Sequence, residues 1–305
     1  MPLVPLSAPT RRRDRIQKVC CAVPVASALG TTLLVANAIQ MASLTLRPFS
    51  RSAFRSANRW LANTWWGWCV TWGQILYDIN IIVSGDDVPM RENAIVVANH
   101  QDMADIPFLM NLAIKKDRLG DMKWFVKKNI KYVPGVGWGM VFLDCLFVER
   151  QWMSDHASIE ATFKRLIDDD VPVWLITFIE GTRVNQEKLA NSQAYALSHG
   201  LKPLRHVLTP RTKGFVASVQ GLRTHIDAVY DITIGYENGV PNLWQYIQGL
   251  AKRAHLHVRR YPINALPQSD EKVSRWIHER FVEKDELLEH FYRHGSFPSA
   301  SGTSQ

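Results

Sequence analysis

The hydrophobic pattern divides the chain into an amino-terminal part with long uncharged runs and a longer part with short ones. The first run, from Val19 to Leu46, holds 28 residues without a charged side chain. As a helix it would be about 42 Å long, whereas crossing a bilayer core needs roughly 30 Å. The apolar region of a cleaved signal peptide has only ~7–15 residues. The run therefore predicts a membrane-embedded helix, with a buried core helix as the alternative.

A second uncharged run, from Trp60 to Tyr77, is crowded with tryptophan, which favours the headgroup zone of a membrane. Basic residues lie on both sides of the first run: Arg11, Arg12, Arg13, Arg15 and Lys18 before it, and Arg47, Arg51, Arg55 and Arg59 after it. The positive-inside rule therefore leaves the topology open. Either the first helix crosses the membrane, or both segments dip into one leaflet and return. The short, interfacial character of the second segment favours the latter.

From about Ile81 onward, short apolar runs alternate with stretches of helical periodicity. The expected strands are Ala94–Ala98, Lys123–Val126, Val171–Phe178, Ala228–Gly235 and His255–Arg260; the expected helices are Pro107–Lys115, Ser154–Asp168, Trp244–Ala251 and Asp270–Tyr292. Such alternation is typical of an α/β fold with a mostly parallel central sheet covered by helices. We expect membrane-anchoring helices over 1–80, an α/β domain over 81–268, and a C-terminal helix with a disordered tail over 269–305.

Composition narrows the partners of the chain without identifying one. The formal net charge is +8 and the pI is about 9.4, which suits nucleic acid, an anionic membrane or an acidic substrate. No zinc-finger spacing, RNA-binding signature or concentrated basic tract favours nucleic acid, so we expect no such partner. The four cysteines form neither a disulfide framework nor a metal pattern, and no two-histidine spacing indicates a metal site.

Candidate chemistry begins at the end of the strand expected over Ala94–Ala98. His100 follows that strand after one residue, and Asp105 comes five residues later, just before Pro107. Proline near a helix start and an acid in its first turn are expected punctuation, so Asp105 is predicted to begin a helix that faces the strand end. There it can accept a hydrogen bond from one imidazole nitrogen and leave the other as a base. The plainer alternative is a capping aspartate beside a surface histidine.

Three further stretches place charged or flexible groups near strand ends. Lys127 opens a basic stretch before a Pro/Gly turn, which either brings cations to a phosphate or solvates an exposed helix. Arg150 ends the strand-like run Leu146–Val148 and can grip a phosphate with two hydrogen bonds or form an ordinary ion pair. The turn Glu180–Arg183 offers a glycine and donors to an anion, or is an incidental tight turn. With the base and the membrane segments, the joint pattern predicts a lipid phosphate held near a general base.

These candidates fall into four ordered motifs: Asn99-His100-x-x-x-x-Asp105, Lys127-x-x-Ile130-x-x-x-Pro134-x-x-Gly137, Phe147-x-x-Arg150 and Phe178-x-Glu180-Gly181-Thr182-Arg183. In this order they resemble the motifs of the glycerolipid acyltransferases, a family that contains the 1-acyl-glycerol-3-phosphate acyltransferases. The stretch Leu208–Phe215 looks like the branch with the lysophosphatidate and lysocardiolipin acyltransferases. One departure is Ile179, where many members have proline.

The resemblance implies a role for each candidate residue. His100 would take the proton from the free hydroxyl of a lysophospholipid, and Asp105 would orient that histidine. The alkoxide would attack the thioester carbonyl of an acyl-CoA, without an acyl-enzyme. Acyl-CoA is then a co-substrate, and neither a cofactor nor a metal is required. The residues expected to bind the substrate are Lys127, Arg150, Glu180, Gly181, Thr182 and Arg183.

The favoured function is acyl transfer to 1-acyl-glycerol-3-phosphate, giving phosphatidic acid. The alternatives are another lysophospholipid, such as lysocardiolipin or a lysophosphoinositide, and an inactive membrane-anchored scaffold of the same fold. The expected partners are the lysophospholipid, acyl-CoA and membrane phospholipids, in the inner membrane of a bacterium or the endoplasmic reticulum of a eukaryote. Of the other histidines, His206 is the weak exception to a packing role, because it lies in a basic loop near Arg211.

Overall fold

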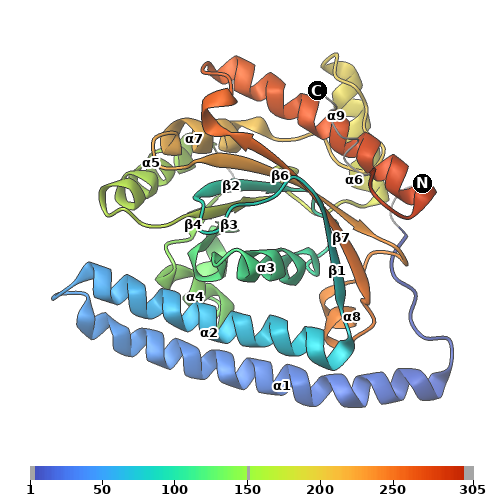
Figure 1. The fold of residues 1–305 in the computed structure, drawn as a ribbon, viewed down its shortest axis with the longest axis horizontal. Helices are drawn as coiled ribbons and strands as arrows, with labels where there is room; N and C mark the ends of the chain where they lie inside the picture. The colour runs from blue at the N-terminus through green and yellow to red at the C-terminus, as the bar shows by residue number, and fades with distance from the viewer. Residues whose placement is uncertain (1–3, 150–151, 299–305) are drawn as a thin grey trace.

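A seven-stranded sheet forms the centre of the computed structural model, which describes residues 4–149 and 152–298 (Figure 1). The strands are β1 (Asn80–Gly85), β2 (Ala94–Ala98), β3 (Met122–Lys127), β4 (Leu146–Val148), β5 (Trp174–Thr177), β6 (Ala228–Tyr236) and β7 (Arg253–Pro262). Their order across the sheet is β1-β7-β6-β2-β5-β3-β4, and every neighbouring pair is parallel except β6 and β7. The α/β fold with a mostly parallel sheet is therefore confirmed.

Helices cover both faces of this sheet. They are α1 (Arg12–Ser43), α2 (Arg51–Tyr77), α3 (Asp105–Lys115), α4 (Val136–Phe142), α5 (Trp152–Asp168), α6 (Gln186–Ser198), α7 (Thr212–Leu222), α8 (Leu243–Ile247) and α9 (Asp270–His294). In Figure 1, α5, α7 and α9 lie above the sheet, while α3, α4 and α8 lie below it with α2 and α1 beyond them.

β2 shows why the strands are apolar throughout. All five of its residues are buried, because both faces of the sheet are covered. Val96 belongs to the hydrophobic cluster on the α3 face with Phe108, whereas Ile95 and Val97 belong to the cluster on the α5–α7–α9 face with Phe215. The uninterrupted apolar run before His100 is therefore explained by a strand that is covered by helices on both faces.

The strand predicted over Ala94–Ala98 is confirmed residue for residue, and other boundaries differ. β5 has only four residues, Trp174–Thr177, because the chain enters it through Pro172, which has no backbone N–H for a ladder. The helix predicted to reach Ala251 ends at Ile247, and Gly249 beyond it has φ +67°. Helices α4, α6 and α7 escaped prediction, and residues 299–305 of the expected disordered tail lie outside the described part.

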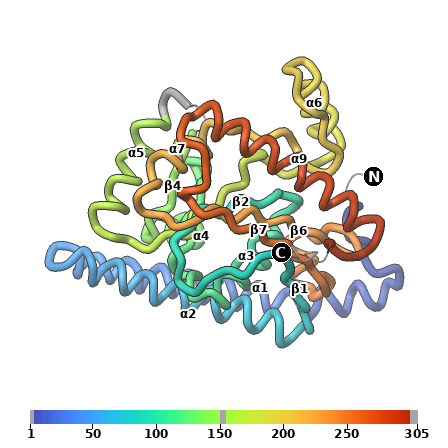
Figure 2. Tube along the Cα trace, turned by 45° about the horizontal axis from the view of Figure 1, so that its top comes forward, coloured from blue at the N-terminus to red at the C-terminus, as the bar shows by residue number. Residues whose placement is uncertain are grey.

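Helices α1 and α2 run side by side along the face of the body below α3 (Figures 1 and 2). Among the described residues, Arg12–Leu46 is the one helical stretch long and apolar enough to cross a membrane. Polar side chains fasten the pair: Trp65 Nε1 donates to Thr32 Oγ1 at 3.1 Å, and Asn58 Nδ2 donates to Ser43 Oγ at 2.9 Å. The two helices therefore form one layer that packs on the body along its length.

A buried ion pair fastens α9 to the sheet beside the central strands. Lys284 Nζ lies 2.6 Å from Asp231 Oδ1, and the side chains are 0% and 2% exposed. Lys284 also donates to the carbonyl oxygen of Ile232 at 2.6 Å. Burial lowers the pKa of Lys284, and Asp231 opposes that shift. Each charge is stabilised mainly by the other, because water is excluded.

Replacing Lys284 by methionine is expected to lower the free energy of unfolding by about 3–5 kcal/mol, because Asp231 would remain as an unpaired buried carboxylate. Adding Asp231→Leu should recover part of that loss. Denaturant unfolding in detergent measures both, with Lys272→Met on the exposed side of α9 as the control. A double variant less stable than Lys284→Met alone would contradict this interpretation.

Candidate active site

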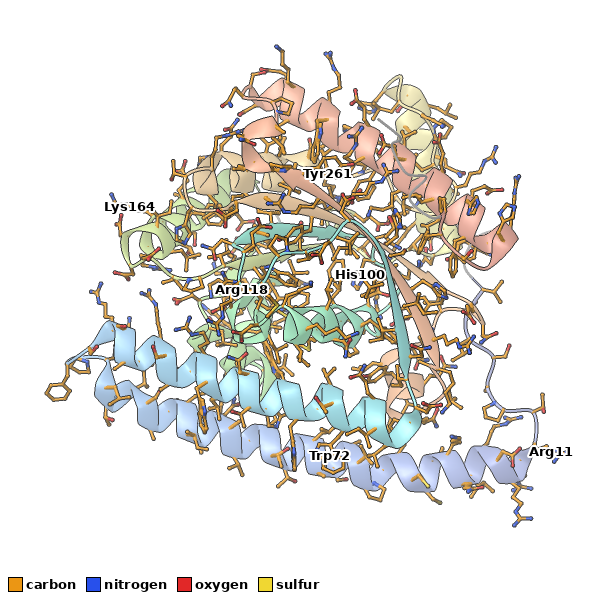
Figure 3. All side chains as sticks on the ribbon, in the orientation of Figure 1. Arg11, Trp72, His100, Arg118, Lys164 and Tyr261 are labelled. Carbon is orange, nitrogen blue, oxygen red and sulfur yellow. The ribbon has the colours of Figure 1, made fainter. Side chains whose placement is uncertain are left out.

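The candidate residues that the structure describes lie at one edge of the sheet, where β2, β3, β4 and β5 all end. These four strands are linked by parallel pairing, so their carboxyl ends share an edge. After β2 the chain enters α3 on one face, whereas after β5 it leads towards α7 on the other (Figure 1). Open α/β sheets bind ligands at such a divergence. Figure 3 shows His100 there, between the sheet and α3.

The carboxylate of Asp105 is the centre of this edge. Asp105 begins α3, as its position before Pro107 predicts, and it is 0% exposed. Its Oδ2 accepts from His100 Nδ1 at 3.0 Å and from the backbone N–H groups of Gln101 at 2.7 Å and Asp102 at 3.1 Å. The short loop between strand and helix therefore wraps around the carboxylate, which excludes the alternative of a surface capping residue.

The second carboxylate oxygen has a partner from a distant strand. Tyr236, at the end of β6, donates its hydroxyl to Asp105 Oδ1 at 2.7 Å. Burial raises the pKa of Asp105, and its hydrogen bonds with His100 and Tyr236 act against that rise. Burial and the neighbouring Asp105 raise the pKa of Tyr236 well above its usual value, so the phenol remains a donor.

His100 is held on its ring and on its backbone, which leaves one nitrogen available. The imidazole stacks on Phe178 with ring centroids 4.1 Å apart and planes 16° from parallel. Its backbone N–H donates to Glu180 Oε1 at 2.7 Å, and its carbonyl accepts from the N–H of Val184 at 3.1 Å. Within residues 4–149 and 152–298, Nε2 has no hydrogen-bond partner, and the side chain is 12% exposed. A neutral imidazole held in this way is a competent proton acceptor.

Glu180 lies inside the protein and holds backbone groups together. Its side chain is buried, and Oε1 and Oε2 accept from the N–H groups of His100 at 2.7 Å and Leu208 at 2.8 Å. Burial raises the pKa of Glu180 to about 8. Both oxygens are hydrogen-bonded, so Glu180 joins its own turn to the loop of His100 and to the segment at Leu208; its expected contact with substrate stays a prediction.

The rest of the turn lies beside His100 and is more accessible. Gly181 has φ +73°, a left-handed conformation that glycine adopts without strain. Thr182 Oγ1 accepts from Lys188 Nζ at 2.7 Å. Arg183 is 51% exposed and lies 3.3 Å from the carboxylate of Asp102 in the loop after β2. The turn thus faces the histidine loop with cationic groups.

Of the other two residues expected to bind phosphate, the structure describes Lys127 alone. Lys127 is the last residue of β3 and is exposed at the shared edge of the sheet. Arg150 lies outside the described residues. Their roles in binding remain predictions, as do those of Glu180, Gly181, Thr182 and Arg183.

Tyr236 contacts Asp105, and Lys188 and Arg211 lie at the turn after β5; none of the three was predicted from the sequence as a site residue. Tyr236 is the last residue of β6, which pairs in parallel with β2, so it lies at the same end of the sheet as His100. Arg211 lies in the loop after α6, and its backbone N–H donates to the carbonyl of Ile179 at 2.7 Å. No local pattern connects these three residues with His100, because they lie far from it in the sequence.

The remaining buried histidines have acidic or hydroxyl partners of their own. His206 Nε2 lies 2.7 Å from Glu289, and His255 Nε2 lies 2.7 Å from Glu237. His206 is therefore held against α9. Within the part of the chain that the structure describes, no group of three or more histidine, cysteine, aspartate or glutamate residues is arranged to hold a metal ion.

The pKa of Glu180 predicts a pH dependence of stability. The folded chain keeps this proton up to about pH 8, whereas an ordinary glutamate releases it near 4.5, so this contribution to stability is lost as pH rises between those values. The difference in melting temperature between wild type and Glu180→Gln should therefore shrink from about pH 5 to about pH 9. Glu187→Gln, exposed on α6, is the control. A melting-temperature difference that stays constant with pH would show that Glu180 does not titrate in this range.

Comparison with known proteins agrees with the motifs. The acyltransferase family model matches residues 80–237, and the acyltransferase C-terminus model matches residues 245–305. The 1-acyl-sn-glycerol-3-phosphate acyltransferase 3 of Arabidopsis thaliana is 36% identical over 280 residues, covering 88% of this chain and 74% of that protein. The 1-acyl-sn-glycerol-3-phosphate acyltransferase delta of Homo sapiens is 34% identical over 291 residues, covering 92% and 74%.

A solved structure resembles the whole arrangement. The 1-acyl-sn-glycerophosphate acyltransferase PlsC from Thermotoga maritima superposes with a TM-score of 0.56 at 18% identity, covering 90% of this chain and 98% of that one. At this identity the likeness concerns the fold. The family models and the relatives above one-third identity carry the assignment further. The chain is a member of the acyltransferase family that includes the 1-acyl-sn-glycerol-3-phosphate acyltransferases.

Proposed function

We propose that the protein transfers a fatty acyl chain from acyl-CoA to the sn-2 hydroxyl of 1-acyl-glycerol-3-phosphate, giving phosphatidic acid. The observation that carries the proposal is the state of His100: Nδ1 is held by a buried carboxylate while Nε2 has no partner in the described structure. Relatives whose names state this acceptor match most of the chain. No cofactor enters the reaction, and acyl-CoA is consumed as a co-substrate.

The proposed step uses His100 as a general base without an acyl-enzyme. Nε2 takes the proton of the acceptor hydroxyl as its oxygen forms a bond to the thioester carbonyl. The tetrahedral intermediate then expels CoA as the thiolate, which takes the proton back from the imidazolium. Asp105 stabilises that cation and keeps Nδ1 as the protonated nitrogen, because its Oδ2 accepts at 3.0 Å. The acceptor hydroxyl is itself the nucleophile, so no serine or cysteine is needed.

Both substrates carry phosphate, and the cations of this sheet edge suit them. Arg183 reaches the edge from the turn after β5, and Lys127 from the end of β3. Holding an anionic headgroup fixes the hydroxyl near the base, and such positioning is a major source of rate enhancement. We assign Arg183 and Lys127, with Gly181 and Thr182, to this task, and we extend it to Arg150 by sequence.

We further propose that α1 and α2 lie in one leaflet of a membrane with the body at its surface. Two separate stretches of α2 pack on the body: Gly120 fits against Arg59 and Asn63, and Gly73 fits against Tyr246. A perpendicular crossing would therefore draw the flank of the body into the bilayer. Trp68 and Trp72, at 55% and 45% exposure, suit an interfacial depth, and Figure 3 shows Trp72 on the side of α2 away from the sheet.

His100→Ala is expected to reduce acceptor-dependent release of CoA from oleoyl-CoA by about 10²–10⁴-fold, the usual contribution of a general base. The assay uses purified protein in micelles with 1-oleoyl-glycerol-3-phosphate, lysocardiolipin and lysophosphatidylinositol as acceptors. Unchanged melting temperature establishes that the variant folds, and His156→Ala on α5 is the matched control. Release without an acceptor would indicate a thioesterase, and no release with any acceptor would favour the scaffold.

The one-leaflet arrangement predicts a depth for Trp68 and Trp72. In vesicles, bromine placed near the headgroup end of the lipid chains should quench tryptophan fluorescence more than bromine at the chain ends. Replacing both tryptophans by phenylalanine should remove much of that difference, whereas Trp276→Phe on α9 should not. Strongest quenching from the chain ends would instead indicate a deep, crossing arrangement.

A further inference from the structure

The turn after β5 carries a side chain from elsewhere in the chain. A methyl group built on Gly181 would lie 3.0 Å from Arg211 Cδ, 3.1 Å from its Nε and 3.4 Å from its Cζ. The first two separations are tighter than ordinary contacts, so the missing side chain of Gly181 makes room for the arginine. Glycine at position 181 therefore serves two purposes: it allows the left-handed backbone conformation, and it leaves space for the side chain of Arg211.

Two hydrogen bonds from backbone N–H groups hold the segment that carries Arg211 against this turn. Leu208 N–H donates to Glu180 Oε2 at 2.8 Å, and Arg211 N–H donates to the carbonyl of Ile179 at 2.7 Å. The segment from Leu208 to Arg211 is therefore hydrogen-bonded to the residues just before Gly181. The base of the Arg211 side chain is therefore placed beside Gly181 before any ligand binds.

The charges around this turn are incompletely neutralised. Arg211 is exposed and Lys188 is partly exposed, and neither has a carboxylate partner among the described residues. Lys188 Nζ instead donates to Thr182 Oγ1 at 2.7 Å and to the carbonyl of Arg183 at 3.2 Å. Arg183 adds a third cation, paired with Asp102. A tri-cationic turn with one acid is suited to an anion.

The turn is also beside the candidate base. Phe178, three residues before Gly181, stacks on the imidazole of His100, and Val184 donates to the carbonyl of His100. Both segments that flank the turn therefore contact His100. A ligand held at the turn would therefore lie close to His100.

We propose that Arg211 and Lys188 form a phosphate-binding subsite over the Gly181 turn. Arg211 supplies a planar pair of donors and Lys188 a second positive charge, so the ligand is a phosphate group of a reacting substrate. Resting on the proposed function, this chemistry has two sources: the phosphomonoester of the lysolipid acceptor and the phosphates of the CoA donor.

The test compares Arg211→Met, Arg211→Lys and Lys188→Met with wild type, all as the full chain in micelles. Titration calorimetry with glycerol 3-phosphate and with CoA reports phosphate binding without requiring turnover. We expect Arg211→Met to weaken binding of one of them about 10–100-fold, as charged hydrogen bonds do, and Arg211→Lys to recover part of it. The ligand affected identifies the source. Arg205→Met, exposed on the same loop, is the matched control.

Kinetics then separate binding from a structural role. With oleoyl-CoA and 1-oleoyl-glycerol-3-phosphate, Arg211→Met should raise the KM of the substrate whose phosphate is bound more than it lowers kcat. Unchanged affinity for both ligands, or equal weakening by Arg205→Met, would overturn the subsite. A wild type that binds the probes yet acylates no lysophosphatidate would refute the proposed acceptor and leave the subsite standing.

Discussion

The buried carboxylate of Asp105 is the interaction on which the site depends. Removing a carboxylate from water is costly unless hydrogen bonds replace the lost hydration. Four donors surround it: an imidazole nitrogen, two backbone N–H groups and the phenol of Tyr236. These demands determine the path of the loop after β2, the start of α3 and the protonated nitrogen of His100. A strand end and a helix start are thereby locked together around one acid.

A second buried acid holds the same histidine from its backbone side. Glu180 joins the loop after β2 to the turn after β5 and to the segment that begins at Leu208. Buried acids therefore organise the loops of the site, and more exposed cations lie at its turn, at Arg183, Lys188 and Arg211. This separation suits the proposed reaction, because both proposed substrates are anions that would meet positive charge at the turn.

The layer formed by α1 and α2 covers one side of the body, the side of α3 and α4. It exposes apolar side chains such as Leu34, Val35 and Ile39, and it packs on α3 and α4 through apolar groups and a few buried polar ones. Asn37 is an example: it is 2% exposed and accepts from the N–H of Gly135 at 2.8 Å, just before α4. A helix rich in apolar residues thus makes a specific contact with the loop that follows Lys127. The proposed membrane layer and the sheet edge are in this way parts of one packed structure.

Local sequence determined what depends on neighbours in the chain. The apolar run Ala94–Ala98 specified a doubly covered strand, and Pro107 with Asp105 specified a helix start, because strand burial and helix punctuation act over a few residues. The ordered motifs specified the family for the same reason.

Only the tertiary structure decided which distant groups complete the site. Tyr236 contacts Asp105 across 131 sequence positions, and Glu180 contacts His100 across 80. The side chain of Arg211 packs over Gly181 because their two loops lie together. The antiparallel orientation of β7 is likewise a property of strand pairing, which the strand itself does not encode. Non-local contacts form because the sheet brings chain ends to one edge, and no local periodicity records that arrangement.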